Sequence, residues 1–109
     1  MRKYHNKQLK TPDGVFDSIK EYNRWNDLKL LQRAGRISDL QRQVRIELIP
    51  TQREENGKVI EFPATYVADF VYTENGRQVV EDCKGYRTAE YKLKRKVLLY
   101  LHGIRIKES

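Results

Sequence analysis

The sequence contains few of the residues that mark secreted, membrane or zinc proteins. One cysteine in 109 residues excludes an internal disulfide and is typical of a reducing cytosol. Two histidines and that cysteine are too few for the usual tetrahedral zinc site. No apolar run approaches ~18 residues, so we expect no membrane span. The start, MRKYHNKQLK, lacks the apolar core of a secretory signal, so we expect a cytoplasmic protein.

Acidic residues are also scarce relative to basic ones. Lys and Arg total 22 against 15 Asp and Glu, which gives a formal net charge of +7. A small protein with that charge favours polyanionic partners, either nucleic acid or an anionic membrane surface. The length indicates one domain, residues 1–109, with material for a single core.

The order of elements predicts an α/β fold with a small mixed β-sheet flanked by helices. The clearest signal is a hairpin of two β-rich runs, residues 66–84, joined by Asn75-Gly76, a favoured type I′ turn. The other expected elements are a basic N-terminal arm or short edge hairpin (1–16), a helix (17–34), a strand (38–49), a loop or irregular hairpin (50–63), a second helix (88–101) and a last strand (104–107).

Each predicted helix carries an apolar stripe with an ionisable residue on or beside it. The first stripe is Ile19, Tyr22, Trp25 and Leu28, and the second is Leu93, Val97, Tyr100 and Leu101. Glu21 lies on the first stripe, and as an alternative it is the third residue of a capping box that begins at Ser18. Lys94 lies beside the second stripe, and as an alternative it forms an i,i+4 pair with Glu90.

The two-residue turn also fixes the register of the hairpin, in which opposed residue numbers sum to 151. Asp69 then faces Asp82, Val71 faces Val80 and Val67 faces Lys84, all on one face. Opposed carboxylates repel, and burial would leave at least one neutral unless a divalent cation keeps both ionised. The alternative is that Asp82 and Lys84 lie on a solvated face while Glu81 and Cys83 point inward.

This set of residues resembles the PD-(D/E)XK nuclease superfamily. The matching residues are Glu21 on the first helix, Asp69 on a strand, and Asp82-Cys83-Lys84 on its hairpin partner. The stretches FDSIKEYNRWNDLKLLQRAGRISDLQRQV, YVADF and VVEDCKGY are similar to small phage-encoded members of that superfamily, most of them uncharacterised in function. Ala68 stands where many members have proline.

The resemblance implies a restriction-endonuclease-like α-β-β-β-α-β core and metal-dependent hydrolysis of phosphodiester bonds. Oxygen ligands from Asp69, Asp82 and the Cys83 backbone carbonyl suit Mg²⁺ or Mn²⁺. Lys84 would orient the attacking water or offset developing negative charge. Glu21 would hold a second metal or its waters. Gln43 is a possible further site residue, although an ordinary polar strand residue is the favoured interpretation.

The C-terminal quarter is a candidate DNA-binding surface. From Lys84 to Lys107 there are eight Lys or Arg residues and one acidic residue, Glu90. The alternative is a solvated helix face. The predicted DNA-contacting residues are Tyr86, Arg87, Lys92, Lys94, Arg95 and Lys96.

The sequence therefore predicts a metal-dependent DNA endonuclease, with a Holliday junction resolvase as the favoured type. The alternatives are a nicking endonuclease on duplex DNA, an inactive nucleic-acid-binding module of the same fold, and a structural protein with surface carboxylates. A resolvase makes two symmetric nicks, so we expect a homodimer. Leu99, on the basic side of the second helix, is the candidate interface residue.

Overall fold

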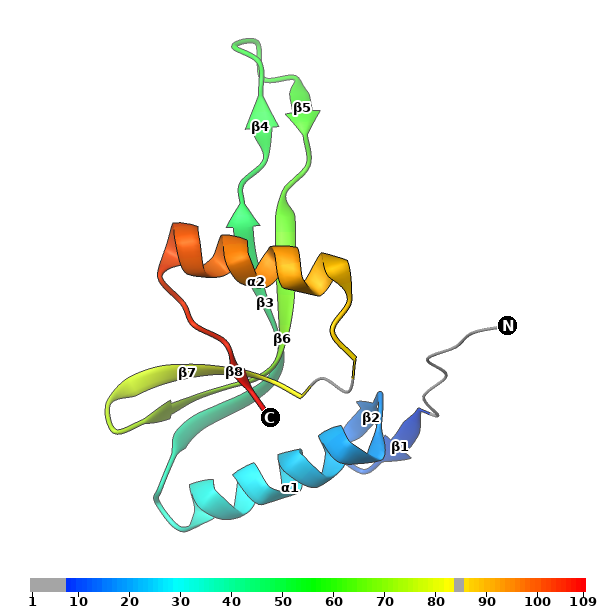
Figure 1. Cartoon of the computed structure of the whole chain (residues 1–109), viewed down its shortest axis with the longest axis vertical. Helices are drawn as coiled ribbons and strands as arrows, with labels where there is room; N and C mark the ends of the chain where they lie inside the picture. Colours follow the sequence, from blue (N-terminus) through cyan, green and yellow to red (C-terminus); the bar gives the residue numbers. More distant parts are fainter. Residues whose placement is uncertain (1–7, 84–85) are drawn as a thin grey trace.

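A computed structural model of the chain describes residues 8–83 and 86–109. It is a mixed α/β fold, as predicted, with two helices and a four-stranded sheet in the order β3-β6-β7-β8 (Figure 1). The elements are β1 (Leu9–Thr11), β2 (Gly14–Phe16), α1 (Ile19–Arg33), β3 (Ser38–Ile49), β4 (Gln52–Arg53), β5 (Val59–Glu61), β6 (Ala64–Glu74), β7 (Arg77–Asp82), α2 (Ala89–His102) and β8 (Lys107–Glu108).

The main sheet is mixed and has an apolar cluster against each helix. β3, β6 and β7 are antiparallel neighbours, and β8 is parallel to β7 after the α2 crossover. On the α2 side, Tyr91 and Leu98 pack with strand residues that include Tyr66 and Val71. On the α1 side, Leu28 packs in a second cluster with Phe70 and Tyr72 of β6 and with Cys83, which follows β7. Adjacent residues such as Val71 and Tyr72 thus serve opposite clusters, as alternation along a strand requires.

The predicted hairpin register is confirmed from the turn inward. Ladder pairs run from Glu74↔Arg77 to Phe70↔Glu81, each summing to 151, and Asn75 takes the positive φ that a type I′ turn needs. The regular alternation then breaks at Asp69, because Ala68 and Phe70 belong to opposite clusters. Across the sheet, the β3–β6 ladder skips the matching position, Gln43, whose φ is +55°. The two strands therefore twist together at this point.

The stripe of α1 is largely confirmed, whereas that of α2 is confirmed only at Val97, which packs against the cluster on the α2 side. Leu28 is fully buried and Trp25 packs against its cluster, but Ile19 is 65% exposed. In α2 the sheet-facing residues are Tyr91 and Leu98. Leu93, Tyr100 and Leu101 of the predicted stripe are exposed instead. The side of α2 that faces the sheet contains Tyr91, whose hydroxyl donates to Glu108 of β8 at 2.6 Å.

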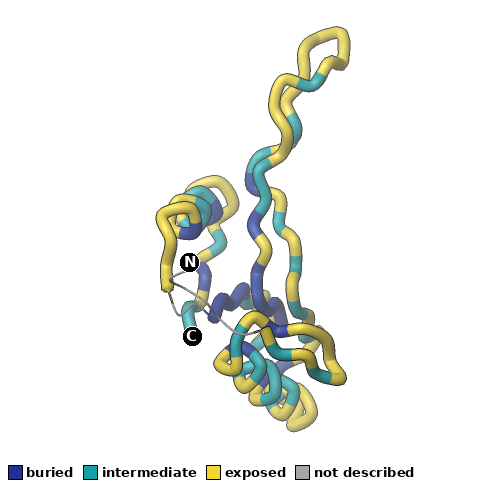
Figure 2. The backbone as a smooth tube through the Cα atoms, turned by 90° about the vertical axis from the view of Figure 1, so that its right-hand side faces the viewer, coloured by how far each residue is buried: buried dark blue, intermediate teal, exposed yellow. Residues whose placement is uncertain are grey.

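Two short hairpins lie outside the main sheet. β1 and β2 form one beside the start of α1, which is the edge-hairpin form of the predicted N-terminal arm. β4 and β5 form the other, which projects beyond the ends of β3 and β6 and is exposed along most of its length (Figures 1 and 2). The radius of gyration is 16.2 Å. A compact domain of this length has about 13 Å, so the projecting hairpin makes the molecule unusually extended.

Candidate functional site

Glu21, Gln43 and Asp69 meet where β3 and β6 twist beneath the start of α1. The Gln43 amide Nε2 donates to Glu21 Oε2 at 3.1 Å and to Asp69 Oδ1 at 3.4 Å. The positive φ of Gln43 allows this, since a regular strand would direct the side chain by simple alternation. Gln43 is thus both an exposed polar residue of β3 and a hydrogen-bond partner of the two carboxylates.

Glu21 is buried, with 3% of its surface exposed, and its two oxygens have different partners. Oε1 accepts the backbone N–H of Asp17 at 3.4 Å, while Ser18 Oγ accepts the Glu21 N–H at 3.1 Å. The capping interpretation is thus confirmed in a variant form, and Oε2 remains directed at Gln43. Burial first, and then the Asp69 carboxylate, raise the pKa of Glu21 to about 6.

One cation lies near this cluster on β3. The Arg42 guanidinium is 3.7 Å from Glu21 Oε2, stacks over the Phe16 ring at 3.8 Å and donates to the Val15 carbonyl at 2.8 Å. The β1–β2 hairpin thereby fixes Arg42 in place. The positive charge of Arg42 lowers the pKa of Glu21, but by less than burial raises it.

Asp82 lies at the end of β7, on the other side of the sheet. Its carboxylate is fully buried and Oδ2 accepts the Tyr66 hydroxyl. Burial, followed by this hydrogen bond, raises the pKa of Tyr66 above its ordinary value, and the Asp69 carboxylate contributes too. Both aspartates are therefore within electrostatic reach of one phenol.

Glu81 is paired within the core, which leaves Asp82 as the neighbouring acidic residue for the candidate site. It is fully buried on the α1 side, where it receives Arg24 Nε at 2.6 Å, Arg24 Nη2 at 3.1 Å and the Tyr72 hydroxyl at 2.6 Å. Burial acts to raise its pKa, but the bonds from Arg24 and Tyr72 leave that pKa below its ordinary value. This carboxylate is an ionised, paired member of the core.

The predicted opposed pair of aspartates is corrected by the structure. The β6–β7 ladder ends at Phe70↔Glu81, so Asp69 and Asp82 do not form a ladder pair. Asp69 Oδ2 instead accepts the Cys83 backbone N–H at 2.8 Å, next in the chain to Asp82. The alternative is wrong for Asp82, whose side chain is fully buried, and right for Glu81 and Cys83, which are buried as well. Lys84 lies outside the described residues.

The types of ligand atom suit a hard divalent cation, whereas their positions in the described residues do not form a metal site. Carboxylate and amide oxygens from Glu21, Asp69 and Gln43 are the ligands that Mg²⁺ and Mn²⁺ prefer. A raised pKa at Glu21 also marks a place where added positive charge would be favourable. Within residues 8–83 and 86–109, however, no three Asp, Glu, His or Cys side chains gather closely enough to hold a metal. To bind a metal together with Glu21 and Asp69, the Asp82 carboxylate would have to replace its hydrogen bond from Tyr66 by a bond to the metal.

The basic C-terminal segment is partly neutralised by a residue just beyond it. Glu108 accepts from Arg95 at 2.8 Å, Arg87 Nε lies 3.1 Å away, and Tyr91 completes the cluster. The hydrogen bond from Tyr91, followed by those from the arginines, lowers the pKa of Glu108 to about 2. Lys94 pairs with Glu90 at 2.9 Å, as its alternative interpretation predicted.

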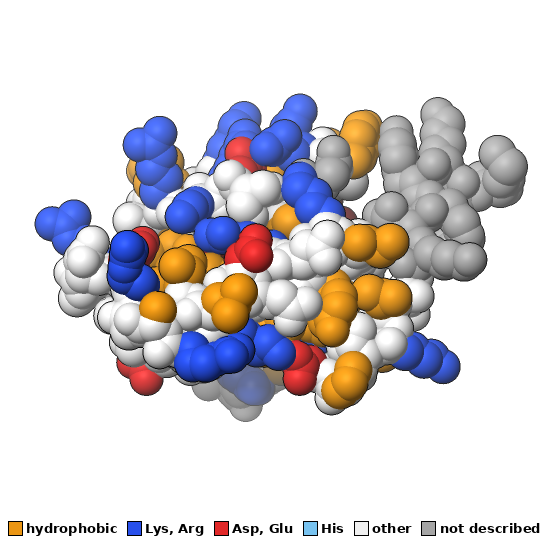
Figure 3. Space-filling model, turned by 90° about the horizontal axis from the view of Figure 1, so that it is seen from below, with side chains coloured by type: hydrophobic (Ala, Val, Ile, Leu, Met, Phe, Trp, Pro, Cys, Tyr) orange, Lys and Arg blue, Asp and Glu red, His pale blue; other side chains and the backbone are white. Residues whose placement is uncertain are grey.

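Lys92 and Lys96 differ from these paired cations. Both are exposed on α2, and neither forms an ion pair with any described residue. Tyr86 is 54% exposed after the end of the motif. Lys and Arg side chains are also spread around the rim of the face seen from below (Figure 3). The cations on α2 that are available to phosphate are thus fewer than the sequence count indicates.

Sequence reasoning missed Tyr66, Arg42 and Glu108. Tyr66 precedes Asp69 by three residues and Arg42 is adjacent to Gln43, but nothing in their spacing indicates a contact. Glu108 was left out because it follows the basic segment in sequence, whereas the parallel pairing of β7 with β8 places it opposite Asp82.

Comparison with known proteins gives a family and no activity. No curated protein and no solved structure matches the chain. Among the described residues, neither helix has the length and apolar character needed to cross a membrane. A family model described as "protein of unknown function (DUF1064)" matches residues 1–106, nearly the whole chain, and the chain belongs to that family.

Proposed function

We propose that this protein is a metal-dependent DNA endonuclease of the PD-(D/E)XK type that acts in the cytoplasm. The observation that supports it most is the hydrogen-bonded set of Glu21, Gln43 and Asp69 beside the end of β7. Two buried carboxylates joined by one amide are costly for a fold of this size, since burial disfavours their ionised forms. A bound Mg²⁺ or Mn²⁺ would stabilise the ionised carboxylates, which would account for burying them side by side.

Each residue then has a distinct task in phosphodiester hydrolysis. Asp69 and Asp82 supply carboxylate oxygens, and the Cys83 N–H holds Asp69 in place. Glu21 adds a third carboxylate, oriented by Gln43. Lys84 follows directly and would place positive charge beside the scissile phosphate. A bound Mg²⁺ would supply Lewis-acid activation of the phosphate and a nucleophile at neutral pH.

Exposed cations on α2 would hold the DNA backbone. Lys92 and Lys96 are the best placed, because they have no competing acidic partner among the described residues. Arg87 and Arg95 can contribute only by exchanging Glu108 for phosphate. Branched DNA remains the favoured substrate, and it rests on small size and the resemblance alone.

A second candidate, an inactive DNA-binding module of the same fold, is favoured by one observation. Asp82 is fully buried and bonded to Tyr66, an arrangement that stabilises the fold without any metal. In this candidate the basic surface still binds DNA, while the carboxylates are structural.

Cleavage assays separate the two candidates. Labelled linear, flap, fork and four-way-junction DNAs are incubated with the pure protein and either Mg²⁺ or Mn²⁺. The endonuclease cuts at least one of them only with metal, and a resolvase cuts the four-way junction in paired symmetric positions. Binding of all four DNAs without any cleavage would establish the inactive module and end the nuclease proposal.

A further inference from the structure

The β4–β5 hairpin is a separate two-stranded unit on which large apolar side chains are exposed. Ile60 is 58% exposed and Phe62 is 81% exposed. β4 and β5 pair only with each other, apart from the main sheet. An isolated two-stranded hairpin is marginally stable in water, and exposed apolar side chains that project from a molecule mark interaction sites.

The charge of the hairpin argues against DNA as its partner. Residues 52–61 contain two basic residues, Arg53 and Lys58, against three acidic ones, Glu54, Glu55 and Glu61. This segment therefore has a net charge of −1 in a chain of net charge +7. An acidic, apolar arm is attracted to a basic protein surface and repelled by phosphate.

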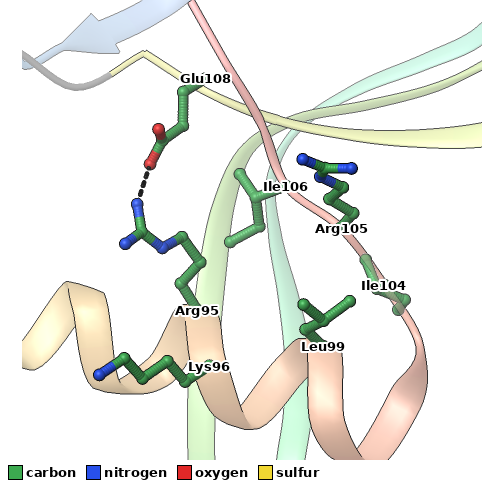
Figure 4. A pocket seen from close by; sticks show the side chains of 7 residues that line it. All are labelled: Arg95, Lys96, Leu99, Ile104, Arg105, Ile106 and Glu108. Atoms are coloured by element: carbon green, nitrogen blue, oxygen red, sulfur yellow. Dashed lines mark hydrogen bonds and ion pairs between the residues drawn. The ribbon is translucent and has the colours of Figure 1, made fainter.

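A surface of the complementary kind lies on the body of the same chain. A pocket of about 280 Å³ lies between α2 and the segment that follows it. Leu99 and Ile106 contribute apolar side chains to it from two elements, with Arg105 and Lys96 around them (Figure 4). Arg95 is already paired to Glu108 there. The seven lining residues are Arg95, Lys96, Leu99, Ile104, Arg105, Ile106 and Glu108.

The composition of this pocket favours an aliphatic or aromatic side chain over a nucleobase. None of its lining residues is aromatic, whereas proteins that hold unpaired bases stack them on aromatic rings. Its apolar floor and basic rim match an apolar anchor flanked by carboxylates. Phe62, next to Glu61, has that composition on the arm.

We propose that two copies of this chain form a twofold dimer in which the β4–β5 arm of each copy docks in the α2 pocket of the other. Reciprocal exchange satisfies both surfaces at once and closes the assembly, because each copy gives one arm and receives one. The partner is thus a second copy of this chain. The proposal stands whether or not the protein cleaves DNA.

The dimer is tested by sedimentation velocity and light scattering with three variants. An arm variant carries Ile60→Ser and Phe62→Ser, and a pocket variant carries Leu99→Glu and Arg105→Glu. Leu30→Gln, on α1, replaces a leucine that is 57% exposed away from both surfaces and serves as the matched control. Melting curves establish that each variant is folded.

Wild type and Leu30→Gln should be dimers at about 10 µM, and each of the other variants should raise the dissociation constant at least about tenfold. An equimolar mixture of the arm and pocket variants should recover a 1:1 heterodimer, since one arm and one pocket remain intact. A wild type that is monomeric at ~100 µM, well above the expected dissociation constant, refutes the proposal. So does a dimer that survives both variants, or a mixture without heterodimer. If the pocket variant loses only DNA binding, the pocket belongs to DNA and the proposal fails.

Discussion

Replacing Glu21 by Gln should stabilise the protein at neutral pH and leave its stability unchanged in acid. Glu21 has a folded-state pKa of about 6 against an ordinary value of 4.5. A carboxyl group with a raised pKa binds its proton more tightly in the folded state. The free energy of unfolding of the wild type therefore falls as the pH rises from about 4.5 to about 6.

The size of the effect follows from the pKa difference. About 1.5 pKa units at 1.36 kcal/mol each amount to about 2 kcal/mol at pH 7. Gln cannot ionise, and its side-chain oxygen can still accept the Asp17 N–H, as a capping residue does. The melting temperature of Glu21→Gln should exceed that of the wild type by about 10 °C at pH 7 and match it near pH 4.

Urea unfolding of both proteins at several pH values between 4 and 8 measures this difference. Glu47→Gln is the matched control, because Glu47 is an exposed glutamate on β3 and its replacement should change little at any pH. A gap between wild type and Glu21→Gln that stays constant with pH, or a variant that is less stable at pH 7, would refute the reasoning about burial.

The stability of the same variant in the presence of metal ions tests whether Glu21 belongs to the proposed metal site. A cation that binds the ionised carboxylate stabilises the wild type by about 1.4 kcal/mol when its concentration is ten times the dissociation constant. Mg²⁺ or Mn²⁺ at pH 7 should therefore narrow the gap to Glu21→Gln, and a chelator should restore it.

Two other perturbations test the core and the basic surface. Arg24→Met removes the cation that pairs with the fully buried Glu81, and it should cost about 3 kcal/mol in urea unfolding because it leaves an unpaired buried charge; a near-neutral result would mean that Glu81 is protonated or reaches water. Lys92→Gln should lower the slope of log affinity for DNA against log salt by about 0.9, whereas Arg95→Gln should lower it less because Arg95 is paired to Glu108; a slope for Lys92→Gln equal to that of the wild type would place the DNA elsewhere.

Local signals predicted much of this fold. The Asn75-Gly76 turn fixed the register of β6 and β7 because a type I′ turn joins directly opposed residues. The bounds of β3, Ser38–Ile49, agree with its predicted range, 38–49. The buried side of α2 was mispredicted because Leu93, Tyr100 and Leu101 have helical spacing but face outward. The side of α2 that packs on the sheet contains Tyr91 and Leu98, and Tyr91 also donates to Glu108.

Of the predicted site residues, the structure joins Glu21, Gln43 and Asp69 by hydrogen bonds, whereas Asp82 is bonded to Tyr66. Glu21 and Asp69 meet as expected, through a Gln43 whose positive φ no sequence pattern indicates. The same local twist ends the regular alternation that would have placed Asp69 and Asp82 face to face. Strand periodicity therefore identifies the strands that carry the site and fails at the irregular position where the carboxylates lie.

The central claim is that Asp69 and Asp82 carry metal-dependent cleavage, and plasmid nicking measures it most directly. Wild type, Asp69→Asn, Asp82→Asn and the control Asp27→Asn, which removes an equal charge from an exposed position on α1, are each incubated with supercoiled DNA and Mg²⁺ or a chelator. We predict metal-dependent nicking by wild type and Asp27→Asn, and none by the two site variants, all four binding DNA alike. Equal nicking by all four proteins, or no nicking by wild type with either Mg²⁺ or Mn²⁺, would contradict the account.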